Sequence, residues 1–345
     1  MIQPADLQAE IFEKTHLGRL ARSGELLRDR YEVCKLLGRG GFGVTFLARN
    51  VRLPASPVCV IKQLCPNVHD STALARSRRR FHQEAKTLSQ LGSHGQIPQL
   101  IDYFVIDGEF YLVQEYIRGR TLVQEVRRSG VWSESAVKQF LQEFLPILSF
   151  VHDRRVIHRD IKPSNILRAA IDDRLVLIDF GAVKERLINP IAPSTSTNFV
   201  GTIGFAPPEQ LALRPVFSSD LYALGVTCLY LLSAKRPIDF DCDPLTGELQ
   251  WRNCVQVSEY FGRVLDKLLK LTPQARFKSA DEVLRILSLE AHLESLRSCM
   301  SNHPMAIEHR LKPPREFVSP MTRTAIAIRD WQTRRAAKVD LESRS

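Results

Sequence analysis

Paired cysteines are the first feature that the sequence lacks. The seven cysteines are odd in number and none lies in a Cys-x-x-Cys motif, so the pattern indicates neither a disulfide framework nor a structural zinc site. They occupy positions 34, 59, 65, 228, 242, 254 and 299. Unpaired cysteines are typical of a reducing compartment, and we therefore expect a cytoplasmic protein.

Long apolar runs are also lacking. The longest, residues 221–232, has the length of a buried helix, whereas a membrane span needs about 20 apolar residues. Residues 1–30 contain no apolar core of a signal peptide, because Asp6, Glu10 and Lys14 interrupt them. We expect no stable membrane insertion, and no internal repeat or low-complexity block is visible.

Basic residues outnumber acidic ones and give a net charge of +10. Part of the excess lies at the C-terminal end, where residues 310–345 contain nine Lys or Arg against four Asp or Glu. Such a segment can dock on an acidic partner or an anionic surface. Its composition is more typical of a solvated, partly disordered tail, which is the interpretation that we favour.

Two short motifs concentrate residues that suit phosphoryl transfer. Residues 158–165 read His-Arg-Asp-Ile-Lys-Pro-Ser-Asn, and residues 179–181 read Asp-Phe-Gly. One carboxylate can orient an attacking hydroxyl, while an amide and a second carboxylate can hold Mg²⁺ on a nucleoside triphosphate. A single Asp or Asn in a loop is usually a turn residue, but the combination favours the catalytic interpretation.

These motifs resemble the catalytic and metal loops of the protein-kinase family, and the form Asp-x-Lys-Pro-x-Asn resembles its serine/threonine-specific branch. The resemblance implies that Asp160 orients the substrate hydroxyl and that Lys162 reaches the transferred phosphate. It also implies that Asn165 and Asp179 bind Mg²⁺, with Mn²⁺ as an alternative metal. Residues 40–46 and 97–100 are similar to bacterial, especially cyanobacterial, members of the family.

A glycine-rich segment lies upstream, with glycines at positions 38, 40 and 43. The same spacing occurs in dinucleotide-binding folds, where it opens a helix. Here the strand-forming residues 44–48 follow, which favours a strand–turn–strand arrangement. In the resemblance, Gly38, Gly40 and Gly43 let the backbone approach the nucleotide phosphates.

Residues 58–62 read as a buried strand that ends in Lys62. A lysine at a strand end is most often a solvated edge residue, but the resemblance implies that Lys62 pairs with the α- and β-phosphates. Residues 74–91 have apolar residues at helical spacing and predict the family's helix αC. Glu84 is the only acidic residue in this helix and is therefore the predicted partner of Lys62. The basic run at residues 76–80 is most simply a solvated face, with a regulatory phosphate site as the alternative.

Residues 111–117 resemble the strand and hinge that join the two lobes of a kinase. The resemblance implies that the Glu115 carbonyl and the Ile117 amide bind the adenine edge. The apolar faces around the ring are then expected to come from three side chains, namely Val44, Val60 and Leu167. Gln114 and Thr121 depart from the residue types usual in the family, and Val60 replaces its usual alanine. We expect these departures to affect nucleotide fit more than catalysis.

Residues 182–209 resemble an activation segment whose middle is rich in hydroxyl groups. Arg159 and Lys184 can clamp a phosphate placed near Thr195 or Thr197, and a flexible Ser/Thr-rich turn is the alternative interpretation. Thr202 is expected to contact Asp160 and Lys162, which favours serine and threonine acceptors.

Three further residues are expected to support the large lobe. The resemblance implies that Asp220 hydrogen-bonds the backbone of the catalytic loop and that Glu209 pairs with Arg276. A buried pair of this kind matters mainly because the loss of one partner is strongly destabilising.

The predicted fold is therefore α+β and two-lobed, with a small antiparallel sheet and helix αC in the N-lobe and a larger, mainly helical C-lobe. The expected divisions are an N-terminal extension (1–30), the N-lobe and hinge (31–117), the C-lobe (118–290) and a basic C-terminal extension (291–345). The N-terminal extension is predicted to form a short amphipathic helix on the small lobe.

The predicted function is transfer of the γ-phosphoryl group of Mg-ATP to Ser or Thr hydroxyls of proteins, with autophosphorylation of the activation segment. Two alternatives remain. They are a catalytically weak, ATP-binding pseudokinase scaffold and a phosphotransferase that acts on small molecules. No nucleic-acid partner is expected, and the sequence identifies no regulatory partner.

Overall fold

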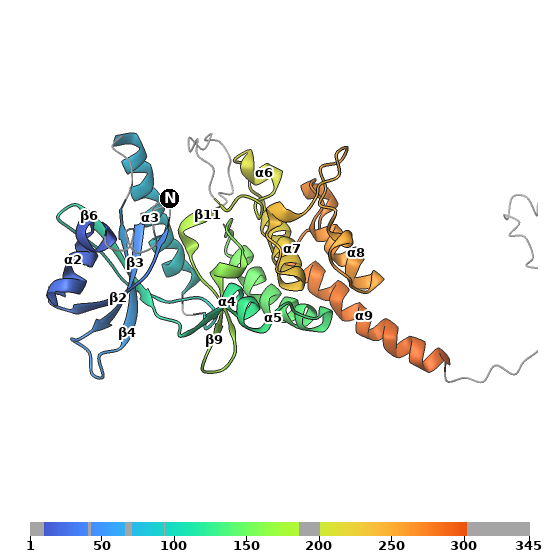
Figure 1. Cartoon of the computed structure of the whole chain (residues 1–345), viewed down its shortest axis with the longest axis horizontal. Helices are drawn as coiled ribbons and strands as arrows, with labels where there is room; N and C mark the ends of the chain where they lie inside the picture. Colours follow the sequence, from blue (N-terminus) through green and yellow to red (C-terminus); the bar gives the residue numbers. More distant parts are fainter. Residues whose placement is uncertain (1–9, 41–42, 66–70, 93, 186–200, 302–345) are drawn as a thin grey trace, which may run out of the picture. The chain divides into compact units, whose positions relative to one another are not determined.

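Strands with alternating burial form a six-stranded antiparallel sheet in the first part of the chain. The computed structural model describes residues 10–40, 43–65, 71–92, 94–185 and 201–301 (Figure 1). The sheet order is β1-β2-β3-β4-β6-β5. Its strands are β1 (Leu26–Leu27), β2 (Tyr31–Gly40), β3 (Gly43–Asn50), β4 (Val58–Leu64), β5 (Leu100–Ile106) and β6 (Glu109–Glu115). The predicted strand–turn–strand after Leu37 is thus formed by β2 and β3.

Helix α3 (Ser71–Leu91) covers one face of this sheet and corresponds to the predicted helix αC, beginning three residues earlier than predicted. Its apolar residues, spaced for one helical face, are buried in the larger of the two main cores. They are Phe81, Ala85, Leu88 and Leu91. Leu112 of β6 faces the same core, while its neighbours Tyr111 and Val113 face the other side of the sheet.

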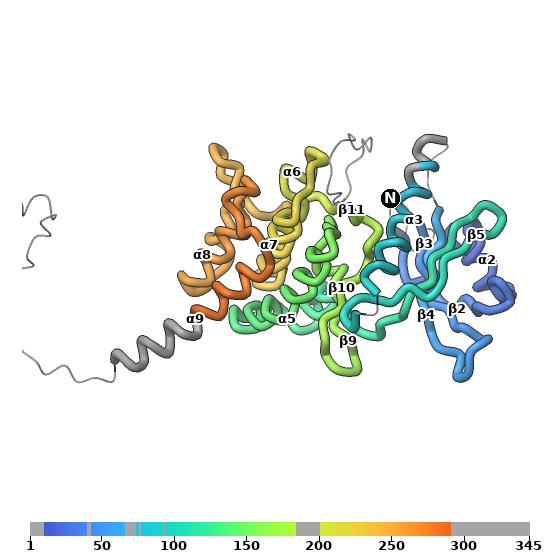
Figure 2. The backbone as a smooth tube through the Cα atoms, turned by 180° about the vertical axis from the view of Figure 1, so that it is seen from behind, coloured from blue at the N-terminus to red at the C-terminus, as the bar shows by residue number. Residues whose placement is uncertain are grey.

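The opposite face of the sheet is covered by the N-terminal segment. Residues 10–14 are helical, α2 (His16–Ser23) follows, and Thr15 caps its first turn. Leu17 and Leu20 of α2 are buried in one core with Phe46 and Ile61 of the sheet. Helix α2 and the β5–β6 hairpin lie at the end of the N-lobe away from the helical lobe (Figure 2). The prediction that the N-terminal extension packs as a helix on the small lobe is therefore confirmed for residues 10–23, and residues 10–27 share a core with the sheet.

The second lobe is mainly helical. Its helices are α4 (Leu122–Ser129), α5 (Glu134–Asp153), α6 (Pro208–Leu211), α7 (Phe217–Ser233), α8 (Glu259–Leu268) and α9 (Ala280–Ser301). Short 3₁₀ turns occur at Pro163–Asn165, Phe180–Ala182, Pro237–Asp239, Trp251–Asn253 and Pro273–Ala275. The compact unit extends to Glu294, and the last residues of α9 begin a second unit. The predicted extension 302–345 lies outside the described residues.

Short strands hold the functional loops between the lobes. Strands β7 (Gly119–Thr121), β9 (Ile166–Ala169) and β10 (Leu175–Leu177) form a small sheet, and β8 (Val156–Ile157) pairs with β11 (Lys184–Glu185). The hairpin of β9 and β10 places the loops before and after it next to each other. These are the two loops that carry the predicted catalytic and metal-binding residues.

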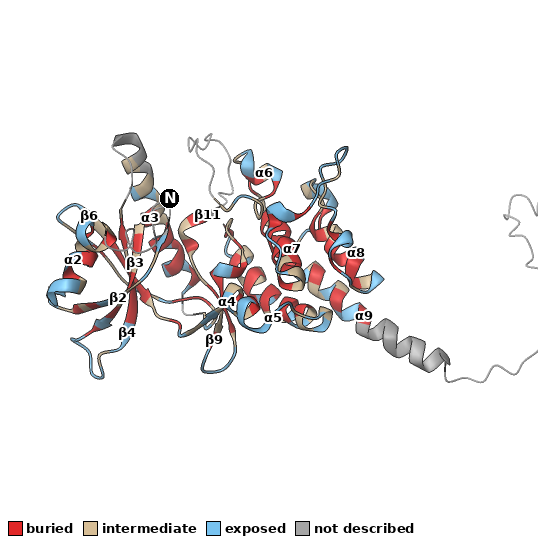
Figure 3. Cartoon of the chain, viewed as in Figure 1, coloured by how far each residue is buried: buried red, intermediate tan, exposed pale blue. Residues whose placement is uncertain are grey.

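Helix α7 accounts for the longest apolar run in the sequence. All its residues from Ser218 to Leu229 are buried, and Figure 3 shows it red along most of its length. In the part of the chain that the structure describes, no helix is long and apolar enough to cross a membrane.

A buried ion pair joins the end of the activation segment to the C-lobe. The Arg276 side chain is fully buried, and its Nη1 and Nη2 donate to the two carboxylate oxygens of Glu209 at 2.6 and 3.0 Å. The same guanidinium also donates to the backbone carbonyls of Ser218 and Leu271. The predicted pairing is thus present, and its bidentate geometry fixes the segment that leads from Thr202 into α6.

We expect Arg276→Ala to lower the free energy of unfolding by about 3–5 kcal/mol, because it leaves the largely buried Glu209 carboxylate without its cation. Urea unfolding measures the change. Arg236→Ala is the matched control, since Arg236 makes a solvent-exposed pair with Asp239 at 2.8 Å, and exposed pairs of this kind contribute little to stability. Equal losses in the two variants would contradict the structural role of the buried pair.

Candidate active site

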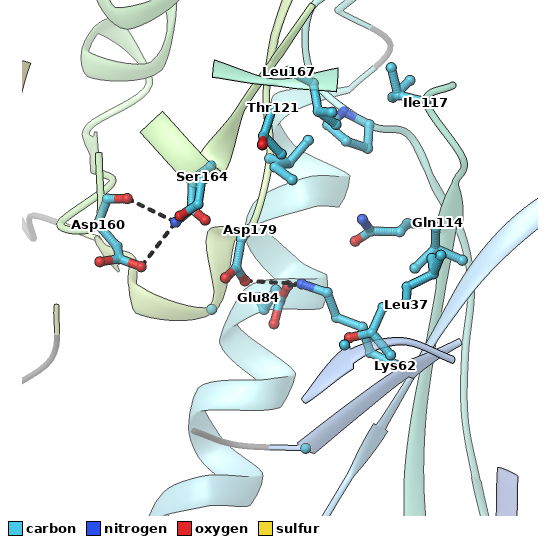
Figure 4. A pocket seen from close by; sticks show the side chains of 18 of the residues that line it. Leu37, Lys62, Glu84, Gln114, Ile117, Thr121, Asp160, Ser164, Leu167 and Asp179 are labelled. Carbon is cyan, nitrogen blue, oxygen red and sulfur yellow. Dashed lines mark hydrogen bonds and ion pairs between the residues drawn. The ribbon is translucent and has the colours of Figure 1, made fainter. Parts of the chain in front are cut away.

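A cleft of about 850 Å³ lies between the sheet and the helical lobe. Its volume is in the range of small-molecule sites. Figure 4 shows side chains from both lobes that point into it. Most of the predicted nucleotide and catalytic residues line this cleft, namely Gly38, Gly43, Val44, Val60, Lys62, Glu84, Glu115, Ile117, Asp160, Lys162, Asn165, Leu167, Asp179 and Thr202.

Three charged side chains from different elements meet at the inner end of the cleft. Lys62 Nζ of β4 lies 2.5 Å from Glu84 Oε1 of α3 and 3.0 Å from Asp179 Oδ1 of the metal loop (Figure 4). The predicted pair of Lys62 and Glu84 is therefore formed, and Asp179 completes the cluster. A buried cation with two carboxylate partners holds the strand, the helix and the loop in one arrangement.

The electrostatic environment keeps Lys62 and Asp179 charged. Burial alone would lower the pKa of Lys62, but the Asp179 and Glu84 carboxylates outweigh it and raise that pKa. The Lys62 ammonium lowers the pKa of Asp179 to about 2. Burial raises the pKa of Glu84, and the attraction of Lys62 acts against this effect. At neutral pH, Asp179 is thus an ionised carboxylate that lines the cleft.

The catalytic loop is held by buried backbone contacts. Asp220 is fully buried at the start of α7, and its carboxylate accepts hydrogen bonds from the backbone N–H groups of His158 and Arg159 at 2.9 and 2.8 Å. Arg159 adopts a φ of 66°, a left-handed conformation that is uncommon for residues other than glycine. The predicted role of Asp220 is thus present as geometry, and it stabilises the strained loop that presents Asp160.

Asp160 is surrounded by the side chains that the sequence predicted. Thr202 Oγ1 donates to Asp160 Oδ1 at 2.7 Å and accepts a hydrogen bond from Lys162 Nζ at 2.7 Å. Lys162 Nζ also lies 2.7 Å from Asp160 Oδ2. The carboxylate is therefore oriented by an ammonium and a hydroxyl beside the open cleft.

Asn165 and Asp179 fit a divalent metal that is shared with a nucleotide. Asn165 Nδ2 donates to both the backbone carbonyl and the carboxylate of Asp160 at 2.9 Å, which leaves its Oδ1 as the acceptor for other partners. Among the described residues, no group of three or more His, Cys, Asp or Glu side chains could hold a metal by itself. One amide oxygen and one carboxylate match Mg²⁺, which usually takes few protein ligands together with phosphates and water.

The outer part of the cleft matches the predicted nucleotide pocket. Val44 and Val60 line it from the sheet, Leu167 from the C-lobe, and Glu115 and Ile117 from the hinge. Gly40 pairs with Gly43 at the end of the hairpin, and the two residues between them lie outside the described residues.

All three predicted departures from the family lie at this pocket, namely Gln114, Thr121 and Val60. Gln114 lines it as a buried polar side chain, directly before the hinge. Thr121 Oγ1 accepts from Gln124 N at 3.3 Å and thereby caps α4, so its hydroxyl also serves a structural contact at the edge of the cleft.

Sequence reasoning missed several residues that line the cleft. Leu37 lies directly before the first glycine and is 43% exposed although it is apolar. Tyr116 of the hinge and Ile178, next to Asp179, also line it. Each of the three is adjacent in the sequence to a predicted site residue, and this adjacency is the only feature of the sequence that could have identified them.

The activation segment is described only at its two ends. Arg159 Nε donates to the carbonyl of Ala182, and burial together with the nearby Arg80 lowers the pKa of Arg159 to about 10. Lys184 pairs through its backbone with Ile157, while its side chain lies outside what the structure describes. Thr195 and Thr197 lie outside the described residues.

The fold and this site define the class of protein, a two-lobed kinase domain with its cleft between the lobes. Residues 31–286 match the protein kinase domain family, and the chain belongs to this family. The resemblance seen in the sequence and the predicted fold are therefore confirmed.

Known relatives agree with this assignment. The chain is 49% identical over 284 residues to Serine/threonine-protein kinase B of Synechocystis sp., an alignment that covers 81% of this chain and 50% of that protein. It is 45% identical over 270 residues to Serine/threonine-protein kinase PknA of Nostoc sp., with 77% of this chain and 48% of that protein covered. The chain thus spans about half the length of the curated relatives that it matches. A solved structure, a double mutant of the Mycobacterium tuberculosis PknI kinase domain, superimposes with a TM-score of 0.58 at 25% identity, covering 76% of this chain and 95% of that one.

Proposed function

We propose that the chain is a serine/threonine protein kinase that transfers the γ-phosphoryl group of ATP to serine or threonine hydroxyls of proteins, with Mg²⁺ as its metal. The observation that carries this proposal is the geometry of the cleft. Asp160, Lys162 and Thr202 contact one another at 2.7 Å, and the ion pair of Lys62 and Asp179 lines the same cleft. All groups that the transfer requires from the protein are present together.

Each group has a separable task. Asp160 accepts the proton of the substrate hydroxyl while the oxygen of that hydroxyl attacks the γ-phosphorus of ATP. The bond between the γ-phosphorus and the β–γ bridging oxygen breaks, and ADP leaves. Lys162 and Lys62 stabilise the negative charge on the phosphoryl oxygens. A divalent metal on Asn165 and Asp179 supplies further charge neutralisation when it is bound.

The acceptor class follows from the surroundings of Asp160. Thr202 belongs to the segment that Glu209 and Arg276 anchor to the C-lobe, so this part of the activation segment has a fixed position beside Asp160. A fixed surface next to the catalytic carboxylate supports a polypeptide substrate more than a small molecule.

The six described cysteines are free, which supports a reducing compartment such as the cytoplasm.

We expect the purified protein to transfer ³²P from [γ-³²P]ATP to a generic protein substrate, with the label on serine or threonine. Asp160→Asn is expected to lower kcat by about 10²–10⁴, because it removes the base while preserving shape. Chelation of divalent metal should abolish transfer and Mg²⁺ should restore it, whereas Mn²⁺ tests metal preference. Nucleotide binding without transfer would instead indicate a pseudokinase scaffold, and transfer only to small molecules would indicate a metabolic phosphotransferase.

Phosphorylation of the activation segment is the regulation that the site supports best. Arg159 lies next to the end of the metal loop, where its Nε donates to the carbonyl of Ala182, and burial together with the positive charge of Arg80 lowers the pKa of Arg159. A phosphate near Thr195 or Thr197 would reduce the repulsion between the two guanidinium groups and form charge-assisted hydrogen bonds.

The Thr195→Ala, Thr197→Ala double variant is therefore expected to lose activity by about tenfold or more, since one charge-assisted hydrogen bond contributes about 1.5–3 kcal/mol. Phosphopeptide mapping of active wild-type protein should find phosphate in residues 194–197. An unmodified segment in active protein, together with full activity of the double variant, would show that no such switch exists.

A further inference from the structure

The N-terminal segment that precedes the kinase-domain match contacts the strand that carries Lys62. The match begins at residue 31, whereas residues 10–27 already pack against the sheet. They cover the face opposite α3, so they lie behind β4 as seen from the cleft. The contacts there are polar as well as apolar, and they converge on Gln63.

Gln63 is the residue next to Lys62 on β4 and points to the opposite face of the sheet. It is 1% exposed, and both the oxygen and the nitrogen of its side-chain amide are hydrogen-bonded. Gln63 Oε1 accepts from the backbone N–H of Leu17 at 2.9 Å, and Gln63 Nε2 donates to Glu109 Oε2.

The contact with Leu17 satisfies both partners. Leu17 lies in the first turn of α2, where backbone N–H groups have no acceptor within the helix. Thr15 caps the neighbouring Gly18 N–H, and Gln63 caps that of Leu17. Because a buried amide without partners is costly, α2 and β4 each stabilise the other's position.

A second connection runs through the β6 strand. Tyr111 is fully buried, and its hydroxyl donates to Glu109 Oε2 at 2.8 Å. Since this uses its single proton, its oxygen accepts from His16 Nδ1, which lies at 2.6 Å. Glu109 thus accepts from both Gln63 and Tyr111, and α2 is joined to the sheet at Leu17 and at His16.

The backbone of Gln63 also restricts which residue can occupy position 43 in the glycine-rich hairpin. A Cβ at position 43 would overlap the backbone carbonyl oxygen of Gln63, so Gly43 is needed for the close approach of β3 and β4 at this point. Val44 pairs with Gln63, and Thr45 pairs with Lys62. The backbone of Gln63 is therefore paired with β3 of the hairpin, while its side chain contacts the N-terminal helix on the far face of the sheet.

We propose that Gln63 is a positioning residue for Lys62 and that helix α2, outside the matched kinase domain, holds it in place. The Lys62 ammonium reaches the cleft from β4, as Figure 4 shows, so its position depends on that strand as well as on Glu84 and Asp179. A strand that shifts by a fraction of an ångström moves the ammonium away from the phosphates. Helix α2 then positions Lys62 through Gln63 and is not only a stabilising cover.

The test is steady-state kinetics of the full chain at a temperature at which circular dichroism shows every variant to be folded. This inference rests on the proposed kinase activity. Gln63→Met keeps the length of the side chain and removes both hydrogen bonds. We expect it to raise the KM for ATP and lower kcat, with kcat/KM for ATP falling by about tenfold or more, since small misplacements of catalytic groups are costly. The KM for the protein substrate should not change.

This pattern separates positioning from mere stability, because a smaller folded fraction lowers the apparent kcat and leaves both KM values unchanged. Leu27→Ala is the control, since Leu27 is 1% exposed in the same core but lies on β1. It should keep the wild-type KM for ATP. An equal rise in this KM in Leu27→Ala, or an unchanged KM in Gln63→Met, would overturn the proposal.

An exchange of the two partners gives a second arm. Gln63→Glu alone places two carboxylates next to each other and should raise the KM for ATP. The double variant Gln63→Glu, Glu109→Gln again pairs one amide with one carboxylate and should restore the wild-type KM for ATP. Failure of the double variant to recover would count against the proposal. If the wild-type chain itself transfers no phosphate, the proposed function fails instead, so the two failures are distinguishable.

Discussion

The ion cluster of Lys62, Glu84 and Asp179 is the interaction on which the rest of the site depends. It places one ammonium between two carboxylates, at 2.5 and 3.0 Å, at a point where the sheet, helix α3 and the metal loop meet. Lys62 and Glu84 are largely withdrawn from water and remain stable as charges only when they are paired, so the sheet, the helix and the loop must adopt one arrangement together. The cluster therefore links the geometry of the nucleotide cleft to the packing of the N-lobe.

Buried polar contacts fix the backbone behind each catalytic group in the same way. Asp220 holds the catalytic loop behind Asp160, and Arg276 holds the end of the activation segment beyond Thr202. Gln63 does this for the strand of Lys62. In each case a buried side chain satisfies backbone or carboxylate groups of a functional segment, so a local position is tied to the core of a lobe.

The sequence predicted the two-lobed fold, and most of the predicted nucleotide and catalytic residues line the cleft, because their roles depend on short, contiguous motifs. Glu84 could be assigned because no other carboxylate occurs in its helix. The role of Gln63 could not be predicted, since its partner Leu17 is 46 positions away and neither residue belongs to a motif. Leu37 was missed for a different reason, because an apolar residue beside a glycine gives no sign of which side of a strand it occupies. Long-range polar contacts of single residues depend on the three-dimensional packing, which local spacing does not encode.

The ionisation of Asp179 tests the central cluster most directly. A pH titration of the nucleotide-free protein with ¹³C-labelled aspartate, followed by carboxyl NMR, should give Asp179 a pKa of about 2. In Lys62→Met the pKa should rise towards its usual value of 3.8, because the ammonium that lowers it most is removed, while Lys162→Met should have a smaller effect. A wild-type Asp179 that titrates near 3.8, or one that Lys62→Met leaves unchanged, would contradict the cluster.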